Sequence, residues 1–395
     1  MLVVRVVLLL AAVVGVLLRP GRLPAWVVPV AAVAVGLAVG AVAPGEVPAS
    51  LRPLAAALGF LLAAVPLSML LDALGFFESL ARVVSTGRRT GLGLWLVAAG
   101  VTAVLNLDAS VVLLTPLYVR IARRSCLDVV ALAFQPVLLA SLASSALPVS
   151  NLTNLIAVGR TGATTTAFIT HLGPPTVLAV AVGYWCWRRA LPLGEGSPAP
   201  VEAAQRRPLV LGGAVVGAVL IGFVAGPVFG VQPWEVAVGA DVLLVALVRR
   251  LPVSSVPLGT ALVAAGLAVL AEAAVSHVDV GHVLHATGTV GLLRTTGIAV
   301  AGADVANNLP AVLVSLPGLP SGSSPTLWAV LLGVNLGPAL VVSGSLAGLL
   351  WSRTAASLGV EVGPAHYSRV GLLVGLPALV VAAAALVVLQ LVLPG

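Results

Sequence analysis

Apolar residues fill a series of long stretches along the chain, and polar residues gather in the short intervals between them. Most of these stretches reach the length of about 20 residues that an α-helix needs to cross the hydrocarbon core of a bilayer. The pattern predicts an all-α polytopic membrane protein with about ten transmembrane helices plus two re-entrant hairpins in inverted-topology repeats. The stretches are 2–18, 24–43, 53–71, 91–119, 125–158, 167–187, 209–226, 235–248, 256–275, 287–316, 326–352 and 370–392.

The composition agrees with a surface that faces lipid. Of the 395 residues, 60% are hydrophobic and only 8% are charged, whereas a soluble domain carries about 25% charged residues. The net charge of +7 comes from Arg residues in short clusters between the apolar stretches. Such clusters mark cytoplasmic loops and do not indicate binding of nucleic acid. The lipid bilayer is therefore a predicted partner, and nucleic acid is excluded.

The stretch 91–119 has Arg clusters on both sides, at 88–89 and at 120–124. If both clusters are cytoplasmic, the stretch enters the membrane and returns to the side from which it came. Asn106 and Asp108 lie at its middle, and a polar turn at membrane depth is tolerated only inside protein or at a cavity. We therefore predict a re-entrant hairpin with a functional tip.

The second half of the chain repeats this layout. The stretch 287–316 centres on Asn307 and Asn308 and lacks flanking Arg clusters, so both of its ends fit the outer side. A long stretch with polar and Pro or Gly residues at its middle follows each hairpin, and we predict a broken helix over 125–158 and over 326–352.

This order predicts two inverted repeats joined by a linker. Residues 1–187 form the first repeat, and residues 209–395 form the second. Each contains three spans, a hairpin, a broken span and a final span, and the first begins outside while the second begins inside. The cytoplasmic linker, 188–208, is rich in Pro and Gly.

Broken helices at mid-membrane carry the candidate chemistry. They free backbone groups and direct the positive ends of half-helices inward, which suits oxyanions and coupling ions. Neutral amides and hydroxyls can bind a polar solute there without a permanent charge in lipid. The alternative is that they only satisfy the interrupted backbone. The candidate substrate-binding residues are Asn106, Ser150, Asn151, Thr153, Asn154, Asn307, Asn308, Ser343 and Ser345.

Three carboxylates inside the apolar stretches are candidates for binding the coupling ion, H+ or Na+. Asp108 and Asp304 lie at or near the hairpin tips, and Asp241 lies in the middle of a span. Intramembrane carboxylates are costly and commonly carry such a role. Asp108 and Asp304 have a second interpretation, as caps of a hairpin arm.

We expect no cofactor and no bound metal. The chain has two cysteines far apart in sequence, which indicate neither a disulfide framework nor a zinc site. Three histidines at 277, 282 and 285 are typical of a solvated loop, with a metal site as the less favoured interpretation. The chain also lacks a phosphate-binding Gly-x-x-x-x-Gly-Lys loop and a His-Glu-x-x-His motif, so we do not expect an enzyme.

Several motifs together resemble those of the bacterial arsenite/antimonite efflux carriers, the ArsB family. The run from Asn106 to Pro116 resembles the family's Asn-Asp-rich hairpin followed by Leu-Thr-Pro, and the run from Val149 to Asn154 its Val-Ser-Asn-Leu-x-Asn break. Asn307 to Pro310 resembles its Asn-Asn-x-Pro hairpin. The run from Asn335 to Trp351 is similar to its Asp-Leu-Gly-Pro segment, with Asn335 where the family has Asp and Ala339 where it has Lys.

The resemblance implies a secondary transporter with the fold of divalent-anion/sodium symporters. It implies a scaffold and a transport domain, elevator-type movement, a homodimer, and in some cases a separate ATPase subunit. The implied substrate is arsenite, antimonite or a related small inorganic oxyanion, extruded in exchange for protons across the bacterial cytoplasmic membrane. The alternative is a sodium-coupled symporter of a carboxylate or inorganic anion.

Overall fold

A computed structural model describes most of the chain, namely residues 1–18, 23–84, 90–194, 205–252, 256–275, 283–284 and 286–392. These residues form helices connected by short loops and contain no strand, which confirms the all-α class. The middle of the predicted linker, residues 195–204, lies outside the described residues. The Arg pair at 88–89 and the histidines at 277, 282 and 285 lie outside them as well.

The first half begins with spans and continues into paired shorter helices. Its elements are α1 (Leu2–Leu18), α2 (Val27–Ala38), α3 (Glu46–Leu51), the 3-10 turn η2 (Arg52–Leu54), α4 (Ala55–Ala73), α5 (Phe76–Val84), α6 (Thr90–Leu105), α7 (Leu107–Arg124), α8 (Val129–Leu142), η4 (Pro148–Ser150), α9 (Leu152–Thr161) and α10 (Thr165–Ala190).

The second half has its elements in a similar order. They are α11 (Arg206–Ala225), η5 (Gly226–Phe229), α12 (Pro233–Val248), α13 (Leu258–Val275), α15 (Gly288–Ala306), α16 (Asn308–Ser315), η7 (Leu316–Gly318), α17 (Pro325–Leu336), η8 (Gly337–Ala339), η9 (Val342–Gly344), α18 (Leu346–Ser357), α19 (Pro364–Val370), the π-turn η10 (Gly371–Gly375) and α20 (Leu376–Val392).

Side-chain caps and glycines set several of the helix boundaries. Asp128 accepts a hydrogen bond from the Ala131 N–H at 2.6 Å and begins α8. Ser324 accepts from the Leu327 N–H at 3.1 Å and begins α17. Gly162, with φ of 73°, ends α9 in the left-handed conformation that glycine adopts without strain. Short polar residues at the start and glycine at the end are the usual limits of a helix.

Five helical segments of the described chain are long and apolar enough to cross a membrane. They correspond to α3–α4, α10, α11, α13 and α19–α20. The shorter apolar helices include α1, α2, and arms of the predicted hairpins and broken spans. α8, one arm of the first predicted broken span, has 14 residues and a length of about 21 Å, so it crosses only part of a hydrocarbon core of about 30 Å.

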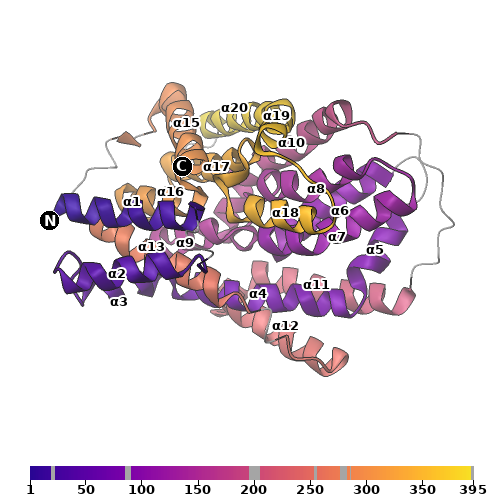
Figure 1. Cartoon of the computed structure of the whole chain (residues 1–395), viewed down its shortest axis with the longest axis horizontal. Helices are drawn as coiled ribbons and strands as arrows, with labels where there is room; N and C mark the ends of the chain where they lie inside the picture. The colour runs from indigo at the N-terminus through magenta and orange to yellow at the C-terminus, as the bar shows by residue number, and fades with distance from the viewer. Residues whose placement is uncertain are drawn as a thin grey trace.

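The helices pack in two groups (Figure 1). We call α1–α5 and α11–α13 the scaffold group: α1, α2 and α13 pack on one another, and α4 packs along α12. We call α6–α10 and α15–α20 the core group, in which α7 packs on α8 and α18, and α10 packs along α20. The groups meet where α4 contacts α7 and α9, and where α13 contacts α16.

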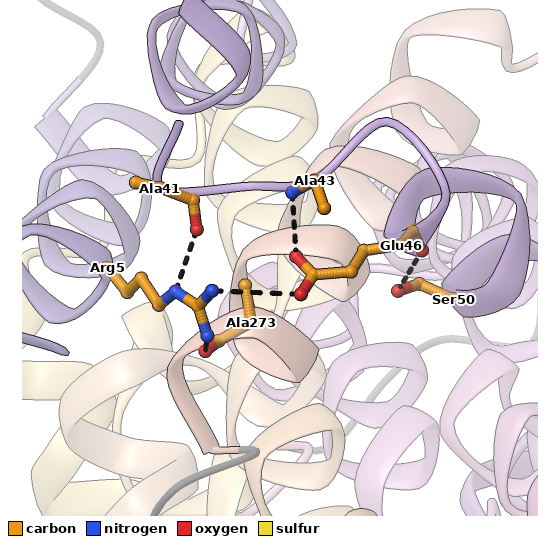
Figure 2. A network of polar contacts seen from close by, with 6 residues as sticks. All are labelled: Arg5, Ala41, Ala43, Glu46, Ser50 and Ala273. Carbon is orange, nitrogen blue, oxygen red and sulfur yellow. Dashed lines mark hydrogen bonds and ion pairs between the residues drawn. The ribbon is translucent and has the colours of Figure 1, made fainter. Parts of the chain in front are cut away.

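A polar network fixes one end of the scaffold group (Figure 2). Arg5 on α1 donates to the Ala41 carbonyl at 2.7 Å and to the Ala273 carbonyl at 3.0 Å. Its guanidinium also lies 3.7 Å from the Glu46 carboxylate at the start of α3. Because Ala273 is in the last turn of α13, a cation there satisfies one of the carbonyls that a helix end leaves unpaired.

Candidate functional site

Two asparagines form the tips of the two helical hairpins with nearly the same backbone conformation. Asn106 lies between α6 and α7 with φ 109° and ψ 148°, and Asn307 lies between α15 and α16 with φ 83° and ψ 149°. The Asn106 side chain accepts from the Asp108 N–H at 2.9 Å, and that of Asn307 accepts from the Leu309 N–H at 3.3 Å. Positive φ is uncommon for residues other than glycine, so each tip is a strained position held by its surroundings.

Hydrogen bonds show that α6 and α7 run antiparallel. Thr102 donates to Ser110 at 2.9 Å, and the Tyr118 hydroxyl donates to the Leu94 carbonyl. Both pairs are placed symmetrically about Asn106, as in a folded-back hairpin. At the second tip, a Cβ atom on Gly302 would lie 3.5 Å from that of Ala311, so α15 and α16 also approach each other closely.

The two hairpins open at opposite ends of the α8–α9 element. Arg123, near the end of α7 and just before α8, donates to the Leu358 carbonyl that follows α18. Gly322, which follows the second hairpin, donates to the carbonyl of Thr161, the last residue of α9, at 2.6 Å. The outer ends of α8 and α9 lie at opposite ends of α10: α10 begins four residues after α9, and the Asp128 N–H at the start of α8 donates to the Leu193 carbonyl just after α10 at 2.9 Å. The 26 residues of α10 have a length of about 39 Å and separate the two ends.

The first helix break is joined to the second half of the chain by one buried asparagine. Asn335, in the last turn of α17, accepts from the Asn151 amide and from the Thr153 hydroxyl, both at 2.8 Å. Its own amide donates to the Asn154 side-chain oxygen at 2.7 Å. We call these four residues the cross-repeat junction. Their exposed fractions are between 0% and 3%, so the junction is shielded from solvent.

Backbone groups complete the junction. The Asn154 amide donates to the Ser144 carbonyl at 2.8 Å and to the Leu147 carbonyl at 3.0 Å, and the Ser150 hydroxyl donates to the same two carbonyls. The Asn151 side-chain oxygen accepts from the Thr153 N–H at 3.2 Å and caps α9. These bonds satisfy the carbonyls that the interruption of the helix frees.

The second break contacts the second hairpin tip. The Asn307 amide donates to the Ser343 carbonyl at 3.1 Å, and Ser345 caps α18 by accepting from the Gly348 N–H at 3.0 Å. The Asp304 carboxylate faces the same break, because a Cβ atom on Gly344 would lie 3.0 Å from Asp304 Oδ1. The structure therefore brings Asp304, Asn307, Ser343 and Ser345 together around this break.

Several polar atoms near the breaks are buried without a hydrogen-bond partner among the described residues. They are Asn106 Nδ2, Asp108 Oδ1, Ser145 Oγ and Asp304 Oδ1. The side chains of Asn106 and Ser145 are 1% and 0% exposed. A buried donor that lacks a partner costs about 1–3 kcal/mol, so such groups favour a polar ligand. The asparagines at 106 and 307 cap α7 and α16, and Asp108 and Asp304 therefore do not fill those cap positions.

Two predicted residues have other surroundings. Asn308 is the first residue of α16 and is 7% exposed, next to the second tip. Asp241 lies in α12, which packs on α4 and α11 in the scaffold group, so the structure does not bring it to either break. The role of Asp241 in ion coupling stays a prediction, and its location separates it from the other candidates.

The breaks combine neutral polar groups with helix N-termini. Residues 143–151 and 337–345 contain no charged side chain. α7, α9, α16 and α18 begin at a tip or at a break, and a helix N-terminus attracts the oxygen atoms of a solute. Among the described residues, no group of three His, Cys, Asp or Glu side chains could hold a metal ion. The arrangement is suited to a small oxygen-rich solute with little or no charge.

Sequence reasoning missed two residues of this site. Asn335 follows an apolar run and stands where the ArsB family has Asp. That correspondence is the sequence signal that could have identified Asn335 as a site residue. Ser145 lies in a Ser-rich run before Pro148, and the same run, read as part of the break, could have identified it. Neither sequence signal reveals which partners these side chains have.

Comparisons with known proteins point to membrane transporters. A family model described as "Citrate transporter" (CitMHS) matches residues 3–333. The arsenical pump membrane protein of Escherichia coli K12 is 27% identical over 397 residues, which cover 89% of this chain and 90% of that protein. The arsenical pump membrane protein of Yersinia enterocolitica is 26% identical over 407 residues, which cover 89% of this chain and 91% of that protein.

An uncharacterized transporter of Mycobacterium tuberculosis is 27% identical over 314 residues, covering 71% of this chain and 72% of that protein. The crystal structure of the Alcanivorax borkumensis YdaH transporter superposes with a TM-score of 0.58 over 87% of this chain and 86% of that chain, at 13% identity. That likeness shows a shared fold and is consistent with the described helices.

Proposed function

Because the chain belongs to the citrate transporter family, we propose that this multi-pass secondary transporter of the bacterial cytoplasmic membrane extrudes arsenite, antimonite or a related small inorganic oxyanion in exchange for protons. The observation that carries the proposal is that the residues of the two breaks, 143–151 and 337–345, include no charged side chain. Arsenous acid is undissociated and neutral at physiological pH, so amides, hydroxyls and helix N-termini can bind it without a fixed cation. The relatives whose printed name is arsenical pump membrane protein support this substrate class.

We propose that the two halves are inverted-topology repeats with re-entrant hairpins. The matching order of elements, the matching conformations of Asn106 and Asn307, and the opposite openings of the hairpins support this arrangement. In such repeats, substrate and ion sites lie near the middle of the membrane, where interrupted helices meet. The predicted substrate-binding residues at the two breaks occupy this place.

We propose that the core group moves against the scaffold group in an elevator-type cycle. The last turn of α9 belongs to the core group and touches the scaffold at two points. Arg160 forms an ion pair with Glu272 on α13, and Gly159 lies against the backbone carbonyl of Pro53 in η2. Both contacts join groups that the proposed motion separates, so they are specific to one arrangement of the cycle.

Asp108 and Asp304 are the proposed coupling groups for H+. Each has a buried carboxylate oxygen without a hydrogen-bond partner, and each lies next to a hairpin tip. A carboxylate in such a place favours a bound cation or proton over a free charge. Asp241 lies away from the tips, and we assign it no direct contact with the substrate.

A homodimer and a separate ATPase subunit are further hypotheses that follow from the ArsB resemblance. A mass measurement of the detergent-solubilised protein tests the dimer, which predicts about twice the mass of one 39.4 kDa chain. Energy-depletion experiments test the ATPase: flux that continues in ATP-free vesicles under an imposed pH gradient shows that the chain works without it.

The second candidate is a sodium-coupled symporter of a carboxylate or inorganic anion, and the family description, which names citrate, favours a carboxylate as substrate. A tricarboxylate carries several negative charges, which would require cations at the site. The breaks contain no Arg or Lys, and this observation favours the neutral oxyacid. Bound sodium ions could supply the charge in the second candidate, so sodium dependence separates the two.

Flux in everted membrane vesicles tests the proposal directly. Vesicles that contain the chain should accumulate arsenite under a pH gradient that is acidic inside, with no requirement for Na+. Citrate in excess should not compete. Sodium-dependent citrate flux with no arsenite flux would select the second candidate, and vesicles with an inactive break variant serve as the control for passive leakage.

A further inference from the structure

The hydrogen-bond directions in the cross-repeat junction are fixed by backbone groups. The Asn154 amide donates to two backbone carbonyls, those of Ser144 and Leu147. Its side-chain orientation is therefore set, because a carbonyl cannot donate in return. The Asn154 oxygen points to Asn335 and requires a donor from it.

Toward Asn151 and Thr153, residue 335 must present an acceptor. Asn151 uses its side-chain oxygen to accept from the Thr153 N–H, so its amide must donate, and it donates to Asn335. The Thr153 hydroxyl donates to the same Asn335 oxygen. Residue 335 must therefore present one acceptor and one donor on the same short, planar group. An amide does so without charge, and a carboxyl group does so only while it holds its proton.

We infer that Asn335 is a positioning residue that keeps the cross-repeat junction closed at every pH, and that proton coupling does not pass through the junction. This inference rests on the proposed function, because it assigns the pH dependence of transport to groups elsewhere at the site. Asn335 fixes the start of α9 to the end of α17 across 181 to 184 residues of sequence. These bonds hold Asn151, Thr153 and Asn154 in place, and with them the α9 N-terminus.

The Asn335→Asp variant tests the inference because the two side chains have the same shape. With a proton, the introduced carboxyl group can make all three bonds of Asn335. Without it, two acceptors face each other at the Asn154 oxygen, in a place where residue 335 is 1% exposed. The variant should match the wild type in acid. Its flux relative to the wild type should fall by about tenfold per pH unit once the group loses its proton.

The matched control is Asn335→Leu, which keeps a similar volume and removes both the donor and the acceptor. This variant leaves the three partners of Asn335 unpaired at every pH, so the ratio of its flux to that of the wild type should not change with pH. A merely space-filling role for residue 335 would give parallel pH profiles for the two variants.

Two readouts separate the junction from the proposed substrate. The first is the melting temperature in detergent between pH 5 and 8, followed by tryptophan fluorescence without substrate. The difference between Asn335→Asp and wild type should grow with pH, and that for Asn335→Leu should stay constant. The second is arsenite flux in proteoliposomes at equal pH on both sides.

Each outcome has a definite meaning. If the melting difference between Asn335→Asp and wild type depends on pH but the wild type shows no arsenite flux, the inference on Asn335 stands and the proposed substrate is wrong. Arsenite flux in the wild type, together with an Asn335→Asp variant whose melting and flux profiles run parallel to the wild type, would overturn the junction and retain the substrate.

Discussion

A single methyl group at Gly159 should shift the balance between the arrangements of the proposed transport cycle. Gly159 lies where α9 crosses η2, and an added Cβ atom would overlap the Pro53 carbonyl oxygen. A backbone carbonyl cannot rotate away as a flexible side chain can. Overpacking of this kind costs about 1–3 kcal/mol, and the better helix propensity of alanine acts on α9 in every arrangement, so it leaves the balance unchanged. This cost corresponds to a factor of about 5–150 in the ratio of this arrangement to the others.

Crosslinking measures this population. In a background without the two native cysteines, Arg160→Cys and Glu272→Cys place thiols on α9 and α13, at two positions that are paired here and that the proposed motion separates. Gly159→Ala should slow their reaction with a short bifunctional thiol reagent, by up to about 150-fold. Gly217→Ala on α11 is the matched control, because its added Cβ atom meets nothing within 4 Å. Equal crosslinking rates with alanine or glycine at 159 would refute the predicted overlap and its link to the cycle.

Two further predictions concern movement and coupling. A cleavable crosslink between cysteines at Arg160 and Glu272 should stop flux until it is reduced. The same crosslink between cysteines at Arg5 and Glu46 should leave flux intact, because both of those residues lie in the scaffold group. Continued flux with the first crosslink in place would contradict the elevator motion. Asp304→Asn should allow downhill flux of the substrate but abolish its acceleration by a pH gradient, and a gradient response equal to that of the wild type would remove Asp304 from the coupling step.

The hydrophobic pattern and the polar interruptions predicted most of the helices. The stretch 91–119 corresponds to α6 and α7 at 90–124, and its predicted tip contains Asn106, the residue at which the chain turns. The runs of Pro, Gly, Ser and Asn lie between α8 and α9 and between α17 and α18, because those residues favour interrupted or capped helices. The second predicted span, 24–43, is shorter in the structure, where α2 ends at Ala38 and Gly40 adopts a positive φ.

The partners at the site could not be predicted from the sequence. Asn335 lies in the last turn of an apolar helix, and its partners are 181 to 184 residues away. The amide directions depend on the Ser144 and Leu147 carbonyls, which become available only when the helix is interrupted in that particular place. For the same reason, the pairing of Arg160 with Glu272 depends on how α9 meets α13, and periodicity carries no information on that contact.

In the proposed mechanism, uncharged groups at the two helix breaks bind and carry a neutral oxyacid. Removal of one unpartnered buried donor should weaken this binding by roughly 1–3 kcal/mol, or about 5- to 150-fold. Ser68→Ala is the control, because the Ser68 hydroxyl is buried in α4 and bonds to its own helix at the Ala64 carbonyl.

The measurement is arsenite uptake into proteoliposomes that contain wild type, Asn106→Ala or Ser68→Ala protein. We expect saturable, proton-driven uptake by the wild type and by Ser68→Ala, and a loss of affinity within that range for Asn106→Ala at equal protein content. Arsenite uptake by Asn106→Ala with the affinity of the wild type would contradict the proposed mechanism.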